Sequence, residues 1–233
     1  MKKIKILIAV SFLLTSFSGT AFELADLSDV LFKDTATGVK GQLKDAKFEF
    51  DAYSTILLDK GLSKNVHILV ARNRSSVLIA GQARTKQLRE KVQRLVLGVA
   101  HVKWKEGDVN DVEPANAQIC GKGASKVSGN ERRKFNLKSA DECSTVNRIY
   151  NEVIVGIPLD EKQQSDDDLL RAKIVNELLY ASIIESADTV KIVVTSSVVY
   201  LLGDQLAKET AEQVTKFVKD LTDVKKVIPL FRF

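Results

Sequence analysis

The feature that most constrains this sequence is a pair of similar stretches that lie 122 residues apart. Residues 75–90 read SSVLIAGQARTKQLRE and residues 197–212 read SVVYLLGDQLAKETAE, which aligns Gly81 with Gly203. One pattern repeated at a fixed distance predicts two copies of one structural unit. The 233 residues of the chain are enough for two small domains.

Each copy begins with two short strands and continues as a helix. Residues 66–70 match residues 190–194, and both ranges are rich in β-branched side chains. The short distance to the next strand indicates a hairpin, whose turn we expect to be two residues shorter in the second copy. After the glycine, apolar residues recur with helical spacing. They are Leu88, Val92, Leu95, Val96 and Val99 in the first copy, and Val214, Phe217, Val218 and Leu221 in the second.

A further helix precedes each hairpin. In the second copy, Leu170, Ile174 and Leu178 predict a helix whose N-terminus we expect residues 165–168 (Ser-Asp-Asp-Asp) to cap. In the first copy, Phe50, Tyr53, Ile56 and Leu57 indicate a shorter helix. Each unit therefore follows the order αββαβ, with two helices on one face of a three-stranded mixed sheet. The expected fold class is α+β.

This pattern resembles the BON domain family. The resemblance rests on the strand residues Val66-x-Ile68-x-Val70 and Val190-x-Ile192-x-Val194, on the segments that end at Gly81 and Gly203, and on a closing strand at 147–153. We expect a first domain at 45–157 and a second at 158–233, after an N-terminal segment at 22–44. Both glycines are expected to be structural. The resemblance implies small modules of the bacterial periplasm and envelope that bind phospholipid surfaces.

Residues 1–21 have the order of a secretory signal peptide: three lysines, the apolar run from Ile6 to Leu14, and small residues before Ala21. The apolar run is too short to span a bilayer, although a retained anchor is the alternative. No cysteine lies near the cleavage site, so we expect a periplasmic protein that starts at Phe22 and is not a lipoprotein. Loss of three lysines lowers the net charge from +5 to +2, so the charge is poor evidence for nucleic-acid binding, and export argues against it.

About forty residues, 104–146, interrupt the first unit and contain the only two cysteines, Cys120 and Cys143. An oxidising compartment favours a structural disulfide between them. A catalytic redox pair is usually a CxxC motif, and a zinc site needs more ligands than these. We therefore expect a surface insertion closed by a disulfide.

No catalytic motif is present in the sequence. There is no P-loop, no GxSxG and no GxGxxG, and neither His67 nor His101 has a partner at metal-ligand spacing. We expect a protein that is not an enzyme and uses no metal or cofactor.

Charge is divided unequally between the copies. Residues 59–105 carry eleven basic and two acidic side chains, a net charge of +9, whereas residues 158–233 carry ten and thirteen, a net charge of −3. Basic side chains of the first copy are candidates for binding anionic phospholipid headgroups. They are Arg72, Arg74, Arg84, Lys86, Arg89, Lys91 and Arg94. The alternative is a solvated face that keeps the domain soluble.

The expected function is support of cell-envelope integrity by a periplasmic protein with two BON domains, lying peripherally on an anionic membrane through its first domain. The alternative is a periplasmic stress chaperone or adaptor. It would bind outer-membrane or secreted protein clients through an apolar groove or an open sheet edge.

Overall fold

A computed structural model describes residues 39–100, 146 and 148–233. The first half of this part comprises α3 (Val39–Leu58), β1 (Val66–Asn73), β2 (Ser76–Ala83), α4 (Lys86–Val99) and β3 (Arg148–Val155). The second half comprises α7 (Glu161–Tyr180), β4 (Lys191–Thr195), β5 (Val198–Asp204), α8 (Lys208–Lys219) and β6 (Lys226–Arg232). The expected closing strand of the first unit is therefore present as β3.

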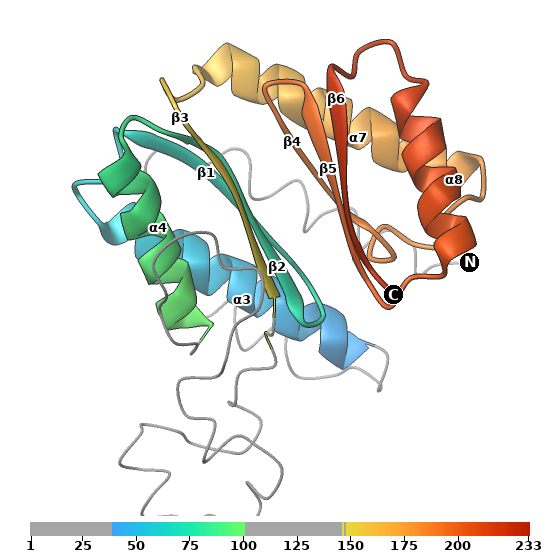
Figure 1. The fold of residues 1–233 in the computed structure, drawn as a ribbon, viewed down its shortest axis with the longest axis horizontal. Coiled ribbons are helices and arrows are strands. Elements are labelled where there is room, and N and C mark those ends of the chain that lie inside the picture. The colour runs from blue at the N-terminus through green and yellow to red at the C-terminus, as the bar shows by residue number, and fades with distance from the viewer. Residues whose placement is uncertain (1–38, 101–145, 147) are drawn as a thin grey trace, which may run out of the picture. The chain divides into compact units, whose positions relative to one another are not determined.

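The two halves have the same topology. In each sheet the first two strands are antiparallel, and the third strand is parallel to the second. The second strand lies in the middle of each sheet, and the helix that follows it crosses over to the parallel edge strand. Both helices of each half cover the same face of its sheet (Figure 1). The predicted α+β class, with two αββαβ units, is confirmed.

The repeat distance of 122 residues holds for the starts of α3, β2 and α4. The helices α3 and α4 begin 122 residues before α7 and α8, and β2 begins 122 residues before β5. The third strands begin only 78 residues apart, because the first half has 44 additional residues before β3.

The hairpin turns differ from the prediction. Both turns have two residues, Arg74-Ser75 and Ser196-Ser197. The expected shorter second turn came from aligning Val66 with Val190, whereas the strand pairing places Ile68 at the position equivalent to Val190. The earlier alignment was therefore displaced by two residues.

The helix α3 is also longer than predicted, because it has the same 20 residues as α7. Its buried face is formed by Asp45, Phe48, Ala52 and Ile56. Of the residues that suggested a helix here, only Ile56 is fully buried, while Phe50 and Leu57 are exposed.

Residues 165–168 do not cap α7, which corrects the expectation. The helix begins four residues earlier, and its N-cap is Asp160, which forms a capping box with Gln163. Asp167 is buried and accepts hydrogen bonds from the backbone N–H groups of Ser196 (2.7 Å) and Ser197 (2.8 Å). This aspartate therefore stabilises the β4–β5 turn.

The sheets of the two halves pack against each other on the faces that the helices leave open (Figure 1). The buried cluster between them contains Ala71, Leu78 and Ala80 from the first half, and Val193, Tyr200 and Leu202 from the second. Each residue of the first set lies 122 positions before its counterpart in the second. Equivalent positions therefore meet, as in a two-fold symmetric dimer.

Polar contacts at the edge of this cluster follow the same symmetry. Gln82 Nε2 donates to Thr195 Oγ1 (2.8 Å), and the Asp204 N–H donates to Asn73 Oδ1 (3.1 Å). Asn73 is equivalent to Thr195, and Gln82 is equivalent to Asp204. The two halves therefore form an internal pseudo-symmetric pair.

Several predictions concern residues outside the described part of the chain. These are the signal peptide, the Cys120–Cys143 disulfide, His101 and nearly all of the insertion. The domain boundaries remain predictions. Within residues 39–100 and 148–233, no helix has the length and hydropathy needed to cross a membrane.

Candidate anionic-surface site

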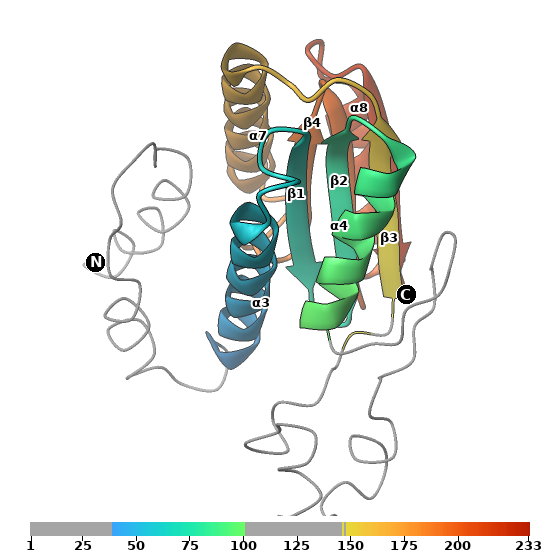
Figure 2. The ribbon, with the colours of Figure 1, turned by 90° about the vertical axis from the view of Figure 1, so that its left-hand side faces the viewer.

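Five elements meet at one end of the first half: the C-terminus of α3, the start of β1, the end of β2, the start of α4 and the end of β3. Two backbone hydrogen bonds join them, from Arg84 N to Asn65 O (3.0 Å) and from Gly156 N to Ala83 O (2.8 Å). The N-cap Thr85 accepts a hydrogen bond from Leu88 N and fixes the start of α4. In Figure 2 this end of the first half lies at the top, where β3 ends and α4 begins.

Four exposed cations lie at this end, and we call them the basic end: Lys60, Lys64, Arg84 and Lys86. Lys60 and Lys64 come from the loop between α3 and β1, whereas Arg84 and Lys86 flank the N-cap of α4. Arg84 and Lys86 were among the predicted headgroup ligands. Lys60 and Lys64 were not, although they had contributed to the excess of basic residues in this copy.

Two other predicted cations on α4, Lys91 and Arg89, bind groups within the first half. Lys91 Nζ lies 2.7 Å from Asp59 Oδ2, and this contact lowers the pKa of the Asp59 carboxyl. Arg89 Nη2 donates to the Asn151 carbonyl oxygen of β3 (3.3 Å). Arg94 is exposed near the middle of the helix. The predicted basic face is therefore concentrated at the N-terminal end of α4.

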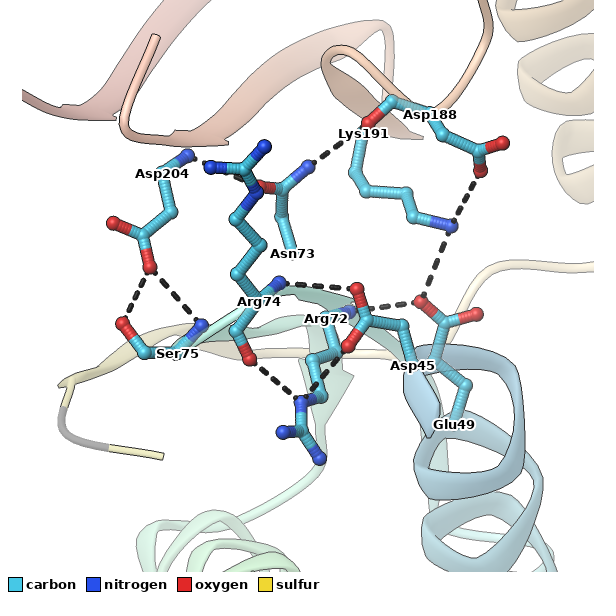
Figure 3. A network of polar contacts seen from close by, with 9 residues as sticks. All are labelled: Asp45, Glu49, Arg72, Asn73, Arg74, Ser75, Asp188, Lys191 and Asp204. Atoms are coloured by element: carbon cyan, nitrogen blue, oxygen red, sulfur yellow. Dashed lines mark hydrogen bonds and ion pairs between the residues drawn. The ribbon is translucent and has the colours of Figure 1, made fainter. Parts of the chain in front are cut away.

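The structure places Arg72 and Arg74 at the opposite end of the sheet, in the network shown in Figure 3. Arg72 has a side chain that is only 11% exposed, and its Nε lies 3.0 Å from Asp45 Oδ1. Arg74 donates from Nη1 to Gln205 Oε1 of the second half (2.6 Å). These two arginines therefore do not extend the basic surface of α4.

In the same network the carboxyls of Glu49 and Asp204 contact residues of the other half. Glu49 accepts from the Arg72 backbone N–H (2.8 Å) and lies 3.9 Å from Lys191 Nζ. Burial raises the pKa of both Glu49 and Asp45 above their usual values. Asp204 accepts hydrogen bonds from the backbone N–H and the hydroxyl of Ser75. The network thus stabilises the hairpin turn and its contact with the second half.

The basic end has no counterpart of equal charge in the second half. The residues 122 positions after the four cations are Ser182, Ser186, Leu206 and Lys208. Only one of the four equivalent positions is basic. The second half therefore serves as an internal control for the basic end, because it has the same scaffold but fewer cations at the equivalent positions.

The second half instead has an open groove of about 520 Å³ between α8 and β6. Its uncharged lining consists of Ala211, Thr215, Pro229, Phe231 and Phe233, and four charged residues of α8 and its C-cap complete it. In the first half the residues equivalent to the first three are Arg89, Gln93 and Asn151. Asn151 Nδ2 donates to Gln93 Oε1 (2.9 Å), and Arg89 also reaches β3. Polar side chains thus bridge helix and strand where the second half has small ones.

Metal-ligating side chains do not cluster within the described ranges. No group of three or more His, Cys, Asp and Glu side chains there could hold a metal ion. Burial lowers the pKa of His67, whose Nδ1 lies 3.2 Å from Gln82 Oε1. This histidine is part of the strand packing.

Among the comparisons with known proteins, a match to a protein family was found only for the second half of the chain. No curated protein matched the chain. Among solved structures, CdsD, a structural protein of the type III secretion system of Chlamydia trachomatis, is 10% identical, with a TM-score of 0.23 over 78% of this chain and 90% of that chain. A structure of the CdsD C-terminal domain is also 10% identical, with a TM-score of 0.22 over 79% of this chain and 96% of that chain. Scores this low do not indicate a shared fold.

A family model gives the informative match. It is the model of the BON domain, and it covers residues 166–233. This range runs from within the first turns of α7 to the end of the chain and includes the whole β4–β5–α8–β6 unit. Over residues 166–233 the chain therefore matches the BON domain family.

Proposed function

We propose that this chain is a non-enzymatic, exported protein with two BON domains that supports the cell envelope and binds anionic phospholipid surfaces through the basic end of its first half. The observation that carries the proposal is the set of four exposed cations, Lys60, Lys64, Arg84 and Lys86, at one end of a compact scaffold. The same order of elements, and helices that begin 122 residues apart, support a BON domain in the first half as well.

The strength of this attraction follows from the number of cations. Each lysine or arginine near an anionic membrane contributes about 1 kcal/mol, so four together contribute about 4 kcal/mol. Salt weakens such contacts, because the screening length is about 8 Å at physiological ionic strength. Glu90 Oε1 lies 3.8 Å from Lys86 Nζ and reduces the contribution of Lys86 to this attraction. Binding is therefore expected to be reversible and strongly salt-dependent.

Vesicle binding by charge-reversed proteins tests the proposal. Changing Lys60, Lys64, Arg84 and Lys86 to Glu is expected to abolish sedimentation with vesicles of phosphatidylglycerol and phosphatidylcholine at low salt. The matched control changes four exposed lysines of the second half to Glu, namely Lys208, Lys216, Lys219 and Lys226. This control alters the net charge equally and is expected to retain most of the binding. Equal loss in both proteins would reject a site at the basic end.

The groove beside α8 favours a second candidate function, the binding of protein clients. Ala211, Pro229 and Phe231 offer an apolar surface to a hydrophobic side chain of a partner. Replacing Ala211, Thr215 and Pro229 by Arg, Gln and Asn, the residues of the first half, is expected to fill this groove. If the protein is a chaperone or adaptor, this variant prevents aggregation of an unfolded outer-membrane protein less well, and its vesicle binding is unchanged. If the variant prevents aggregation as well as the parent protein does, the groove is not the client-binding site.

A further inference from the structure

The connector between the two halves is unusually apolar for an exposed segment. Residues 154–159 read IVGIPL and run from the last two residues of β3 to the residue before the α7 N-cap. Ile154 is 52% exposed, Val155 48% and Ile157 78%. Figure 2 shows the connector leaving β3 at the end where α4 begins. Exposed apolar patches that are rimmed by polar residues mark contact surfaces for proteins or membranes.

A second group of exposed apolar side chains lies at the same end. Leu57 and Leu58 end α3, and they are 64% and 82% exposed. They directly precede the loop that carries Lys60 and Lys64. The apolar side chains of the connector and of the α3 terminus therefore occur together with the four cations of the basic end.

Charge identifies which partner fits this combination. Exposed cations beside exposed leucine and isoleucine side chains match the interface of an anionic bilayer, where headgroups bind the cations and the acyl region accepts the apolar groups. Asp160 and Glu161 follow the connector at the start of α7 and limit the apolar run on that side.

We infer that the connector 154–159 and the α3 terminus insert into the interfacial region of an anionic membrane while the basic end binds the headgroups. This inference rests on the proposed function and adds a penetrating, salt-resistant component to it. Because apolar burial is not screened by salt, part of the binding is expected to persist when the electrostatic part is weakened.

The second half provides a matched position for a test. Tyr180 is equivalent to Leu58 and is 94% exposed, so it is at least as accessible to a membrane. However, three of the four cations beside Leu58 are uncharged at the equivalent positions of the second half. An orientation set by the basic end places residue 58 in the membrane and residue 180 in water.

The experiment measures tryptophan emission with vesicles whose phosphatidylglycerol and phosphatidylcholine carry bromine on their acyl chains. The only tryptophan, Trp104, is replaced by Phe, and one new tryptophan is introduced as Leu58→Trp, Ile157→Trp or Tyr180→Trp. Brominated chains are expected to quench emission at 58 and 157 and to leave emission at 180 unchanged. Unfolding midpoints equal to that of the parent protein show that the three variants fold.

The other outcomes separate the two proposals. If the protein binds anionic vesicles but emission at 58 and 157 is not quenched, the protein adsorbs by charge alone, and insertion is overturned. Quenching at 180 would overturn the assigned orientation. Absence of binding to anionic vesicles would overturn the proposed function, and insertion with it. As a second measurement, a Leu58→Ser and Ile157→Ser protein is expected to bind vesicles at low salt and to lose the salt-resistant part of binding.

Discussion

Asp45 and Asp167 are equivalent residues that have the same role in the two halves. Each projects from the first helix of its half and accepts a backbone N–H of the hairpin turn, from Arg74 (3.0 Å) in the first half and from Ser196 in the second. Arg74 has a φ of 55°, and Ser196 and Ser197 have φ values of 55° and 60°. Left-handed backbone costs residues other than glycine about 1–2 kcal/mol. The carboxylate bonds offset this cost, which explains how turns without glycine are tolerated.

Asp167→Ala is expected to destabilise the protein by about 1–3 kcal/mol, because two turn N–H groups lose their acceptor. Its neighbour Asp166 is exposed, so Asp166→Ala is expected to change the free energy of unfolding by less than about 0.5 kcal/mol. Urea unfolding of both variants measures the difference. If the aspartate run acted only as helix-terminal charge, the two substitutions would have similar effects.

The two repeat glycines are expected to differ in their tolerance of alanine. Gly81 has a φ of 122°, and an added Cβ would lie 2.0 Å from the His67 carbonyl oxygen. At Gly203 the nearest atom would be Cδ1 of the Phe231 ring, at 2.9 Å. A ring can rotate, whereas a paired strand backbone cannot move without breaking the sheet.

Gly81→Ala is therefore predicted to cost more than about 3 kcal/mol, and Gly203→Ala about 1–3 kcal/mol. Unfolding midpoints in urea compare the two variants. Equal losses would show that close backbone approach is not the reason for glycine at position 81.

At the scale of helices and strands, the sequence predicted the order of elements well, because hydrophobic periodicity carries that information. The misaligned first strand shows the limit of this signal. Side chains of a strand alternate with period two, so a displacement of two residues keeps the same face and leaves the apolar pattern unchanged. Only the strand pairing, which places Val70 opposite Ile79, resolves it.

Two other features were present in the sequence and could have been predicted. Asp160 and Gln163 have the spacing of a capping box, which marks the true start of α7. All eight residues of β2 are buried, and its apolar run Val77–Ala80 does not alternate with polar residues. Such a run is typical of a strand covered on both faces, and it therefore indicated the packing of sheet on sheet.

The candidate site was predictable only in part. Arg84 and Lys86 could be assigned to the exposed N-terminal end of α4 from helical periodicity. The burial of Arg72 depends on Asp45, a residue 27 positions earlier on another helix, and no local pattern reports such a contact. The proximity of Lys60 to α4 likewise follows from the tertiary arrangement of the α3–β1 loop.

Tyr200 provides a test of the contact between the sheets. Burial raises the pKa of its hydroxyl to about 12, and Glu152 contributes in the same direction. Because the folded protein holds this proton more tightly than the unfolded chain, Tyr200 lowers stability progressively as the pH rises from about 10 to about 12. Below pH 10 the effect is absent.

Tyr200→Phe removes this titration. The wild-type protein is therefore expected to lose more stability than the variant between pH 9 and pH 11.5, as measured by urea unfolding, while both respond alike to titration of their lysines. Parallel stability curves for the two proteins would contradict burial of Tyr200 between the sheets.

At the scale of the whole molecule, the repeat explains both what the halves share and what separates them. Their sheet faces are occupied by each other, so the surfaces left for partners are the helix faces, the strand edges and the two ends. The basic end belongs to the first half, and the open groove belongs to the second. The repeat thus combines one scaffold with two different exposed surfaces.

The most direct test of the central claim is a salt titration of vesicle binding by the expected mature chain, residues 22–233. Sedimentation is measured with phosphatidylglycerol-containing vesicles and with pure phosphatidylcholine vesicles, from low to above physiological potassium chloride. Binding to the anionic vesicles alone, decreasing steeply with salt, is the result that this account predicts. Equal binding to both vesicle types, or no binding to either at low salt, would contradict it.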